Sequence, residues 1–233
     1  VQIQTHDGNE DIEVDPDGFI KFETAGSEAM RIDSAGTIFH RTTAPTLHSS
    51  YTGIVFENGS LINDVTRGAN KSITLAQNVA IDSGNTWAYL AQDEASAYQQ
   101  YAGNHYFYTA PLAGVAGSDA TLTSKLTILN GGNVGIGTTA PSGVLHCVVD
   151  DTYGEAYFEI ADDSVSNDFG LKLQKARGTI GSKSAVQEND RVGFIGWQGY
   201  DAGGAYRYTA AIISHVDGEP SSGDMPGRLT FQT

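Results

Sequence analysis

The sequence has little cysteine, little basic charge and no long apolar run, and each shortage excludes a class of protein. A single cysteine, Cys147, among 233 residues rules out an intrachain disulfide framework and a cysteine-rich zinc site. The 13 basic side chains face 28 acidic ones, and the net charge of −15 argues against attraction to nucleic-acid phosphates or to anionic lipid. No apolar run approaches the roughly 18 residues that a membrane-spanning helix needs. We therefore expect neither a nucleic-acid partner nor insertion into a membrane.

The abundant residues are glycine, tyrosine and phenylalanine. Glycine provides 28 of the 233 residues, well above its usual share of roughly 7%, whereas charged residues make up only 18%. The 11 tyrosines and 9 phenylalanines supply most of the bulky side chains. This mixture is typical of elongated β proteins with many turns, and we predict an all-β fold.

Two sequence patterns recur along the chain. Residues 30–45 and 126–141 align without a gap at an offset of 96 (126 − 30) and end in the same tetrapeptide, T-T-A-P. A shorter pattern, G-x-x-x-F-x-T, occurs at 18–24, 103–109 and 227–233. If the matches are not chance in a biased composition, both patterns belong to one repeated unit. The unit predicts equivalent β-hairpins in its two full copies and the start of a third copy at residue 227.

Each predicted hairpin has a turn and an end that the residues indicate. Segments 33–36 and 130–133 are rich in Asp, Asn and Gly, which tolerate the positive φ of tight turns. Pro45 and Pro141 are expected to end the return strands, because proline cannot donate to a strand ladder. In the second copy, glycines alternate with Val134 and leave one strand face bare, which permits the close approach of another backbone. So small a unit cannot bury its own apolar face, so units stack or identical chains associate.

Other segments also predict strands. Asn58-Gly59 marks a hairpin turn, and residues 191–200 and 205–216 make the clearest long hairpin. Further strands are expected over 157–160 and 169–173, joined by a polar loop.

Residues 87–102 fit either a helix or a strand–loop–strand. We favour the second interpretation, because Gly103 begins a pattern that is β elsewhere. We divide the chain into a first β-repeat module (1–48), a second β-repeat module with an aromatic insert (49–147), and a C-terminal β-hairpin module that ends at the start of a third repeat (148–233).

Three motifs resemble a known family. G-N-V-G-I-G-T-T-A-P at 132–141 resembles the repeat of bacteriophage tail fibre and tailspike proteins, and M-R-I-D-S-A-G at 30–36 resembles the strand that leads into it. Residues 190–233, from D-R-V-G-F to P-G-R-L-T-F-Q-T, resemble another segment of such fibres. The first copy departs from the motif at T-I-F-H-R (37–41).

The resemblance implies an elongated, intertwined homotrimer of tandem β-hairpin repeats and small β-sheet modules. It implies a tail fibre of the virion, assembled in the cytoplasm of the bacterial host, that adjoins other tail or baseplate proteins and binds a host-surface glycan without catalysis. Two alternatives stay open. One is a tailspike enzyme that depolymerises glycans, and the other is a head fibre or capsid decoration protein.

Catalytic and metal-binding patterns are weak in this sequence. Some tailspikes cleave glycans with paired carboxylates, but nothing in the spacing of the 28 acids singles out a pair. Residues 7–11 begin like a calcium loop, but Ile12 stands where that loop needs glycine. His48 and His146 recur after the two T-T-A-P segments, without the spacing of a metal site within one chain. We predict no catalytic residue, no metal and no cofactor.

Aromatic side chains are the best candidates for contact with a glycan, because sugar C–H groups stack on aromatic rings. Cross-strand aromatic packing is the competing interpretation. The net charge favours a neutral or cationic sugar over a polyanion. Glycines 196, 199, 203 and 204 are expected to clear space beside the first group of rings. The candidates are Trp197, Tyr200 and Tyr206 with Asp201 and Gln198 as hydrogen-bond partners, and, as a second choice, Trp87, Tyr98 and Tyr106.

Overall fold

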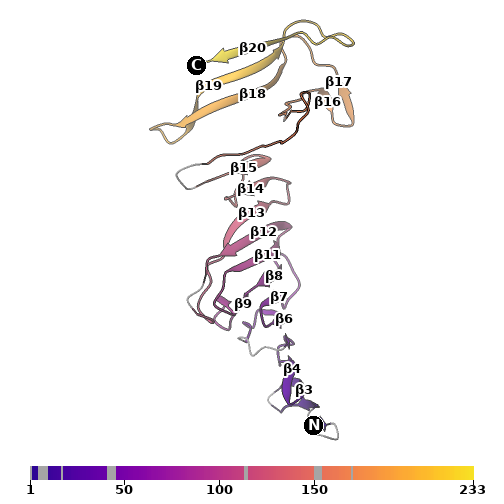
Figure 1. Cartoon of the computed structure of the whole chain (residues 1–233), viewed down its shortest axis with the longest axis vertical. Helices are drawn as coiled ribbons and strands as arrows, with labels where there is room; N and C mark the ends of the chain where they lie inside the picture. Colours follow the sequence, from indigo (N-terminus) through magenta and orange to yellow (C-terminus); the bar gives the residue numbers. More distant parts are fainter. Residues whose placement is uncertain are drawn as a thin grey trace. The chain divides into compact units, whose positions relative to one another are not determined.

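The computed structural model describes residues 2–4, 10–16, 18–40, 46–112, 115–149, 154–168 and 170–233. Every regular element in these ranges is a β-strand, which confirms the all-β prediction (Figure 1). The chain divides into two compact units, Val1–Glu155 and Ala156–Thr233. The expected boundary between residues 48 and 49 lies inside the first unit, and the one between 147 and 148 lies near its end.

The first unit is built on one sheet of thirteen strands. In sheet order they are β1 (Gln2–Gln4), β2 (Asp11–Val14), β3 (Ile20–Thr24), β4 (Ser27–Ile32), β5 (Ile38–His40), β6 (Tyr51–Phe56), β7 (Gly59–Asp64), β8 (Ser72–Gln77), β11 (Ala95–Tyr101), β12 (Asn104–Ala110), β13 (Thr123–Ile128), β14 (Val134–Ile136) and β15 (Leu145–Cys147). Neighbours are antiparallel, except that β6 is parallel to β5 and β15 is parallel to β14. Figure 1 shows these strands following one another along the sheet in chain order.

Two short strands lie outside the large sheet and pair with each other. They are β9 (Val79–Ile81) and β10 (Trp87–Tyr89), which lie in the sequence between β8 and β11. Residues 87–102 therefore form a strand, a loop and a second strand, which confirms that prediction over the helical one. The hairpin predicted around Asn58-Gly59 is also confirmed, as β6 and β7.

The hairpins at the two sequence matches have the same strand register. Phe22 on β3 stands opposite Met30 on β4, and Phe107 on β12 stands opposite Leu126 on β13. The ladder shifts by one residue directly after each phenylalanine. Phenylalanine and the following bulge thus occupy corresponding places in both hairpins.

The turns of these hairpins also correspond. The N–H of Gly36 donates to the carbonyl of Asp33 at 2.9 Å, and the N–H of Gly132 donates to the carbonyl of Leu129 at 2.8 Å. Both glycines have positive φ, 81° and 90°, as the predicted tight turns require. Pro45, which was expected to end the first return strand, lies outside the described residues.

Glycine, and not proline, ends the second return strand. β14 stops one residue before Gly137, whose φ is 72°, well before Pro141, so the expected role of this proline is wrong. A Cβ on Gly137 would lie 2.1 Å from the carbonyl oxygen of Val148, and a Cβ on Gly135 would lie 2.4 Å from that of Thr138. The bare strand face therefore does admit a close backbone, which comes from the same chain.

The core of the first unit lies between one face of the large sheet and the β9–β10 pair. Inward-pointing side chains of β5, β6 and β7 form one cluster with β9, and alanines of β8, β11 and β12 form another with both short strands. The buried members are Phe39, Leu47, Val55, Ile62, Ala80 and Ile81 in the first cluster, and Ala76, Val79, Tyr89, Ala95, Ala97, Ala110 and Ala120 in the second.

Asn78 holds the loop that joins β10 to β11. Its Nδ2 donates to the carbonyls of Ala91, Asp93 and Glu94 at 3.2, 2.9 and 3.1 Å. Its Oδ1 accepts the N–H of Ala91 at 2.8 Å. The residue has a φ of 58°, which asparagine tolerates better than most side chains. Asn78 is buried, so these bonds satisfy an amide that has lost its water.

The second unit holds a small pair and a three-stranded antiparallel sheet. The pair is β16 (Arg177–Thr179) with β17 (Ser182–Ser184). The sheet consists of β18 (Arg191–Tyr200), β19 (Tyr206–Val216) and β20 (Gly227–Gln232). The long hairpin predicted from the sequence is confirmed as β18 and β19.

The strands predicted over 157–160 and 169–173 are wrong. The described residues between 154 and 176 form no strand, and Phe169 lies outside them. Alternating apolar residues suggested strands there, but the Leu171 side chain stays largely exposed. A strand also requires a partner for its backbone N–H and C=O groups, and the residue pattern of one segment does not supply it.

Candidate functional site

The end of the β18–β19 hairpin presents two aromatic rings to solvent. Tyr200 and Tyr206 stand directly opposite each other in the ladder, with ring centroids 5.1 Å apart at an interplanar angle of 69°. The two residues are 69% and 67% exposed. The structure thus brings together two of the predicted glycan-binding residues on a surface that a ligand can reach.

Asp201 fixes the turn that joins these two strands. Its Oδ1 accepts the N–H of Ala205 at 2.9 Å, and its Oδ2 accepts Nε–H of Arg207 at 3.0 Å. These bonds, with the backbone one first, hold the pKa of the Asp201 carboxyl below its usual range. The carboxylate proposed as a sugar ligand is therefore already engaged in its own hairpin.

Trp197 and Gln198 lie at an irregularity in the same hairpin. The ladder shifts between them, so that Trp197 stands opposite Ala210 while Gln198 stands opposite Tyr208. The Thr209 hydroxyl donates to the Trp197 carbonyl at 3.3 Å. Trp197 is 50% exposed, and Gln198 is exposed as well. Trp197 and Tyr200 are three residues apart on β18, and successive residues of a strand point to opposite faces, so the tryptophan does not share one surface with the tyrosine pair.

Gly196 leaves space on β18 that the rings of neighbouring residues of the protein occupy. A Cβ on Gly196 would lie 2.7 Å from the ring of Tyr208 and 3.1 Å from that of Phe194. The space that this glycine was expected to leave for a ligand is therefore filled by protein. The two rings meet edge to face, with centroids 5.9 Å apart.

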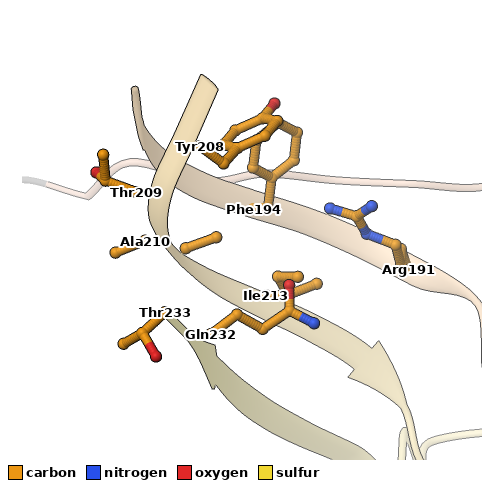
Figure 2. A pocket seen from close by; sticks show the side chains of 9 residues that line it. Arg191, Phe194, Tyr208, Thr209, Ala210, Ile213, Gln232 and Thr233 are labelled. Carbon is orange, nitrogen blue, oxygen red and sulfur yellow. The ribbon is translucent and has the colours of Figure 1, made fainter. Parts of the chain in front are cut away.

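A pocket of about 300 Å³ lies beside these two rings, and sequence reasoning missed most of it (Figure 2). It draws residues from all three strands of the sheet. Arg191 begins β18 and Gln232 ends β20, so only the strand pairing brings them to one place. No local sequence signal indicated the site, because the ladder partner of Tyr208 is Gln198, which does not line the pocket. The lining residues are Arg191, Phe194, Tyr208, Thr209, Ala210, Ala211, Ile213, Gln232 and Thr233.

The second predicted surface does not form. Trp87 is partly buried and packs against both core clusters. Tyr98 and Tyr106 lie on opposite faces of the large sheet, because Tyr98 pairs with Phe107 and the adjacent residue of β11 pairs with Tyr106. Tyr98 stacks on Phe107 at 4.9 Å and bonds through its hydroxyl to Nδ1 of His105 at 2.6 Å. The rings of Tyr98, Phe107 and His105 therefore take part in cross-strand packing within the large sheet, which is the competing interpretation.

An unbroken row of apolar side chains crosses the large sheet on the face opposite the core. Each member is the ladder partner of the next, from β2 to β14, so all of them share that face. None is buried, and Leu75 is 58% exposed. The row consists of Val14, Ile20, Ile32, Ile38, Ile54, Leu61, Leu75, Tyr98, Phe107, Leu126 and Ile136. We call it the apolar row.

The positions beside the apolar row on the same face are also free of Asp, Glu, Lys and Arg over much of its length. Next to its first half stand Ile12, Phe22, Met30, His40 and Phe56, and next to its second half stand Ile73, Gln100, His105, Ile128 and Val134. Charged side chains of this region lie on the other face, where Lys21 forms ion pairs with Glu13 at 2.7 Å and with Glu23 at 2.9 Å.

No protein-family model matches the chain, and no curated protein matches it either. Within the described ranges, no three His, Cys, Asp or Glu side chains are grouped as ligands for a metal ion. The same ranges contain no helix long and apolar enough to cross a membrane.

Proposed function

We propose that this chain is a structural, non-enzymatic protein of a bacteriophage virion fibre, assembled in the bacterial host, that forms a homotrimer and contacts a host-surface glycan. The apolar row is the observation that carries the proposal. The resemblance of residues 30–36, 132–141 and 190–233 to tail fibre repeats supports the class of protein, and the shared register of the two hairpins supports tandem repeats.

The apolar row fits contact between copies of the same chain. Each copy carries a net charge of −15, so copies can associate only through a surface that buries little charge. The row offers such a surface over eleven successive strands of the sheet. Complete burial of a large apolar side chain contributes about 1.5–3 kcal/mol, so each half-exposed member would contribute about half of that. Three copies, the number that the resemblance implies, would place their rows around a common axis.

Light scattering on the purified chain tests the assembly. We expect a mass of about 74 kDa, three times 24.7 kDa, at micromolar concentration. The Leu75→Lys variant should yield a monomer that keeps its β circular dichroism, because a trimer would bury three unpaired ammonium groups. Val65→Lys is the matched control, since Val65 is also exposed but follows the end of β7. A monomeric wild-type chain, or a Leu75→Lys variant that still trimerises, would contradict the proposal.

Binding to host cells tests the second part. The β18–β19 hairpin supports glycan contact, because its side chains Trp197, Tyr200 and Tyr206 are exposed. Trp197→Ala should keep the oligomeric state and weaken cell binding by roughly tenfold, about 1.4 kcal/mol. Dissociation or unfolding of that variant would instead make the ring structural. Release of reducing ends from host polysaccharide would favour the tailspike alternative, and immunolabelling of the head would favour a head fibre.

A further inference from the structure

We propose that the pocket between β18, β19 and β20 binds an acidic sugar, one that carries a carboxylate, such as a uronic acid residue of a host polysaccharide. Arg191 would pair with the carboxylate, and Phe194 and Tyr208 would contact the sugar ring. This inference rests on the proposed glycan recognition and names the class of sugar.

Arg191 is held in a position that suits it to a carboxylate. Its guanidinium carbon lies 5.1 Å from the ring centroid of Phe194. Figure 2 shows the guanidinium pointing from the start of β18 toward the two rings. A cation–π contact involves the face of the aromatic ring and forms no hydrogen bond with the guanidinium N–H groups. Those N–H groups form the planar fork that matches the two oxygens of a carboxylate.

The charge around Arg191 also favours an anion. None of the side chains that line the pocket is that of an Asp or a Glu. Other basic side chains of the second unit form ion pairs: Arg177 and Lys175 both pair with Asp190, at 2.8 and 3.4 Å, and Arg207 pairs with Asp201. No ion pair involves Arg191 in the part of the chain that the structure describes, so its charge remains available to a ligand.

The net charge of the chain favours a neutral or cationic sugar, whereas Arg191 in the pocket favours an anionic one. Charges farther away than the Debye length, about 8 Å at physiological salt, are largely screened at an exposed site. The charge of Arg191 therefore acts on a ligand in the pocket more strongly than the acidic side chains beyond that distance.

The rest of the pocket suits a sugar more than a simple anion. A volume of about 300 Å³ is at the lower end of the range for ligand sites, which fits one sugar ring. The faces of Phe194 and Tyr208 carry partial negative charge and accept the polarised C–H groups of a sugar. Gln232 adds an amide that can donate to and accept from hydroxyl groups.

Titration calorimetry with matched probes tests the proposal on the assembled wild-type protein. D-glucuronate and D-glucose differ at one carbon, which is a carboxylate in the first and a hydroxymethyl group in the second. We expect glucuronate to bind at least tenfold more tightly than glucose. Acetate should not compete with it at equal concentration, because acetate cannot contact the rings.

Variants locate the binding. Arg191→Gln should weaken glucuronate binding at least tenfold, and Tyr208→Ala should weaken the binding of both glucuronate and glucose. Arg207→Gln is the control, because this arginine lies on the same hairpin but outside the pocket. A thermal unfolding midpoint measured for each variant separates loss of binding from loss of folding. Arg191→Lys keeps the positive charge but lacks the planar N–H groups of the guanidinium, so it should bind glucuronate with intermediate affinity.

Three results would overturn the inference: equal binding of glucuronate and glucose, equal competition by acetate, or unchanged glucuronate affinity in Arg191→Gln. If the protein trimerises and binds host cells but fails any of these tests, only the acidic-sugar assignment is wrong. If trimerisation and cell binding fail, the proposed function is wrong independently of the pocket.

Discussion

Replacement of Gly137 by alanine probes why the return strand of the second hairpin needs glycine. The φ of Gly137 is 72°, and a non-glycine residue in that left-handed region costs about 1–2 kcal/mol. The new Cβ would lie 2.1 Å from the carbonyl oxygen of Val148. That segment cannot retreat freely, because the N–H of Val148 donates to the carbonyl of Ile136 at 2.8 Å. Overpacking of this kind costs about 1–3 kcal/mol, so we expect a total loss of about 2–5 kcal/mol.

Two glycines of the same motif separate backbone strain from the steric clash. Gly132 has a φ of 90° but open space around a Cβ, so Gly132→Ala should lose only the backbone part, about 1–2 kcal/mol. Gly131 has neither a positive φ nor a close neighbour, so Gly131→Ala should be neutral or slightly stabilising. The measurement is the free energy of unfolding in urea, at one protomer concentration, followed by circular dichroism. Equal stability of the Gly137→Ala and Gly131→Ala variants would refute the reasoning.

Two further predictions concern buried and charged hydrogen bonds. Asn78→Ala should lower the free energy of unfolding by about 2–4 kcal/mol, since it leaves part-buried carbonyls without donors and places alanine at positive φ. Asn78→Gly should lose less, because glycine accepts that φ, and a larger loss in the glycine variant would contradict this account. The second concerns Asp190, whose carboxyl pKa is lowered first by the hydrogen bonds from Arg177 and then by the N–H of Gln187. Its stabilising effect is therefore present above the pKa of an unfolded aspartate and is lost as pH falls through the lowered pKa. Arg177→Gln should reduce stability at pH 7 and converge with wild type in strong acid, and parallel pH profiles would exclude the ion pair as the cause.

Local chemistry made the hairpins of this protein predictable. Positive φ at Gly36 and Gly132 is a property of single residues, and the Asp, Asn and Gly around them indicate a tight turn without knowledge of any distant contact. The same holds for the β18–β19 hairpin, which is predicted from its own residues. Where a strand required a partner elsewhere, as over 157–160, the pattern alone was insufficient.

The glycan candidates were predictable only in part, for the same reason. The hairpin places Tyr200 and Tyr206 together because they are equally distant from one turn. Trp197 is three residues from Tyr200 on β18, so strand alternation turns its side chain to the other face. Trp87 was misplaced because its role depends on packing against β9 and two core clusters, which are tertiary contacts.

The sequence by itself determined the class of fold, the turns and the pairing within each hairpin, because these depend on backbone preferences of residues close together in the chain. Only the tertiary structure decided which face of the large sheet is covered. β6 and β7 carry apolar side chains on both faces, Val55 and Ile62 on one, Ile54 and Leu61 on the other, so alternation does not distinguish them. The β9–β10 pair covers the first face and leaves the apolar row exposed, because a folded segment can bury only the face on which it packs.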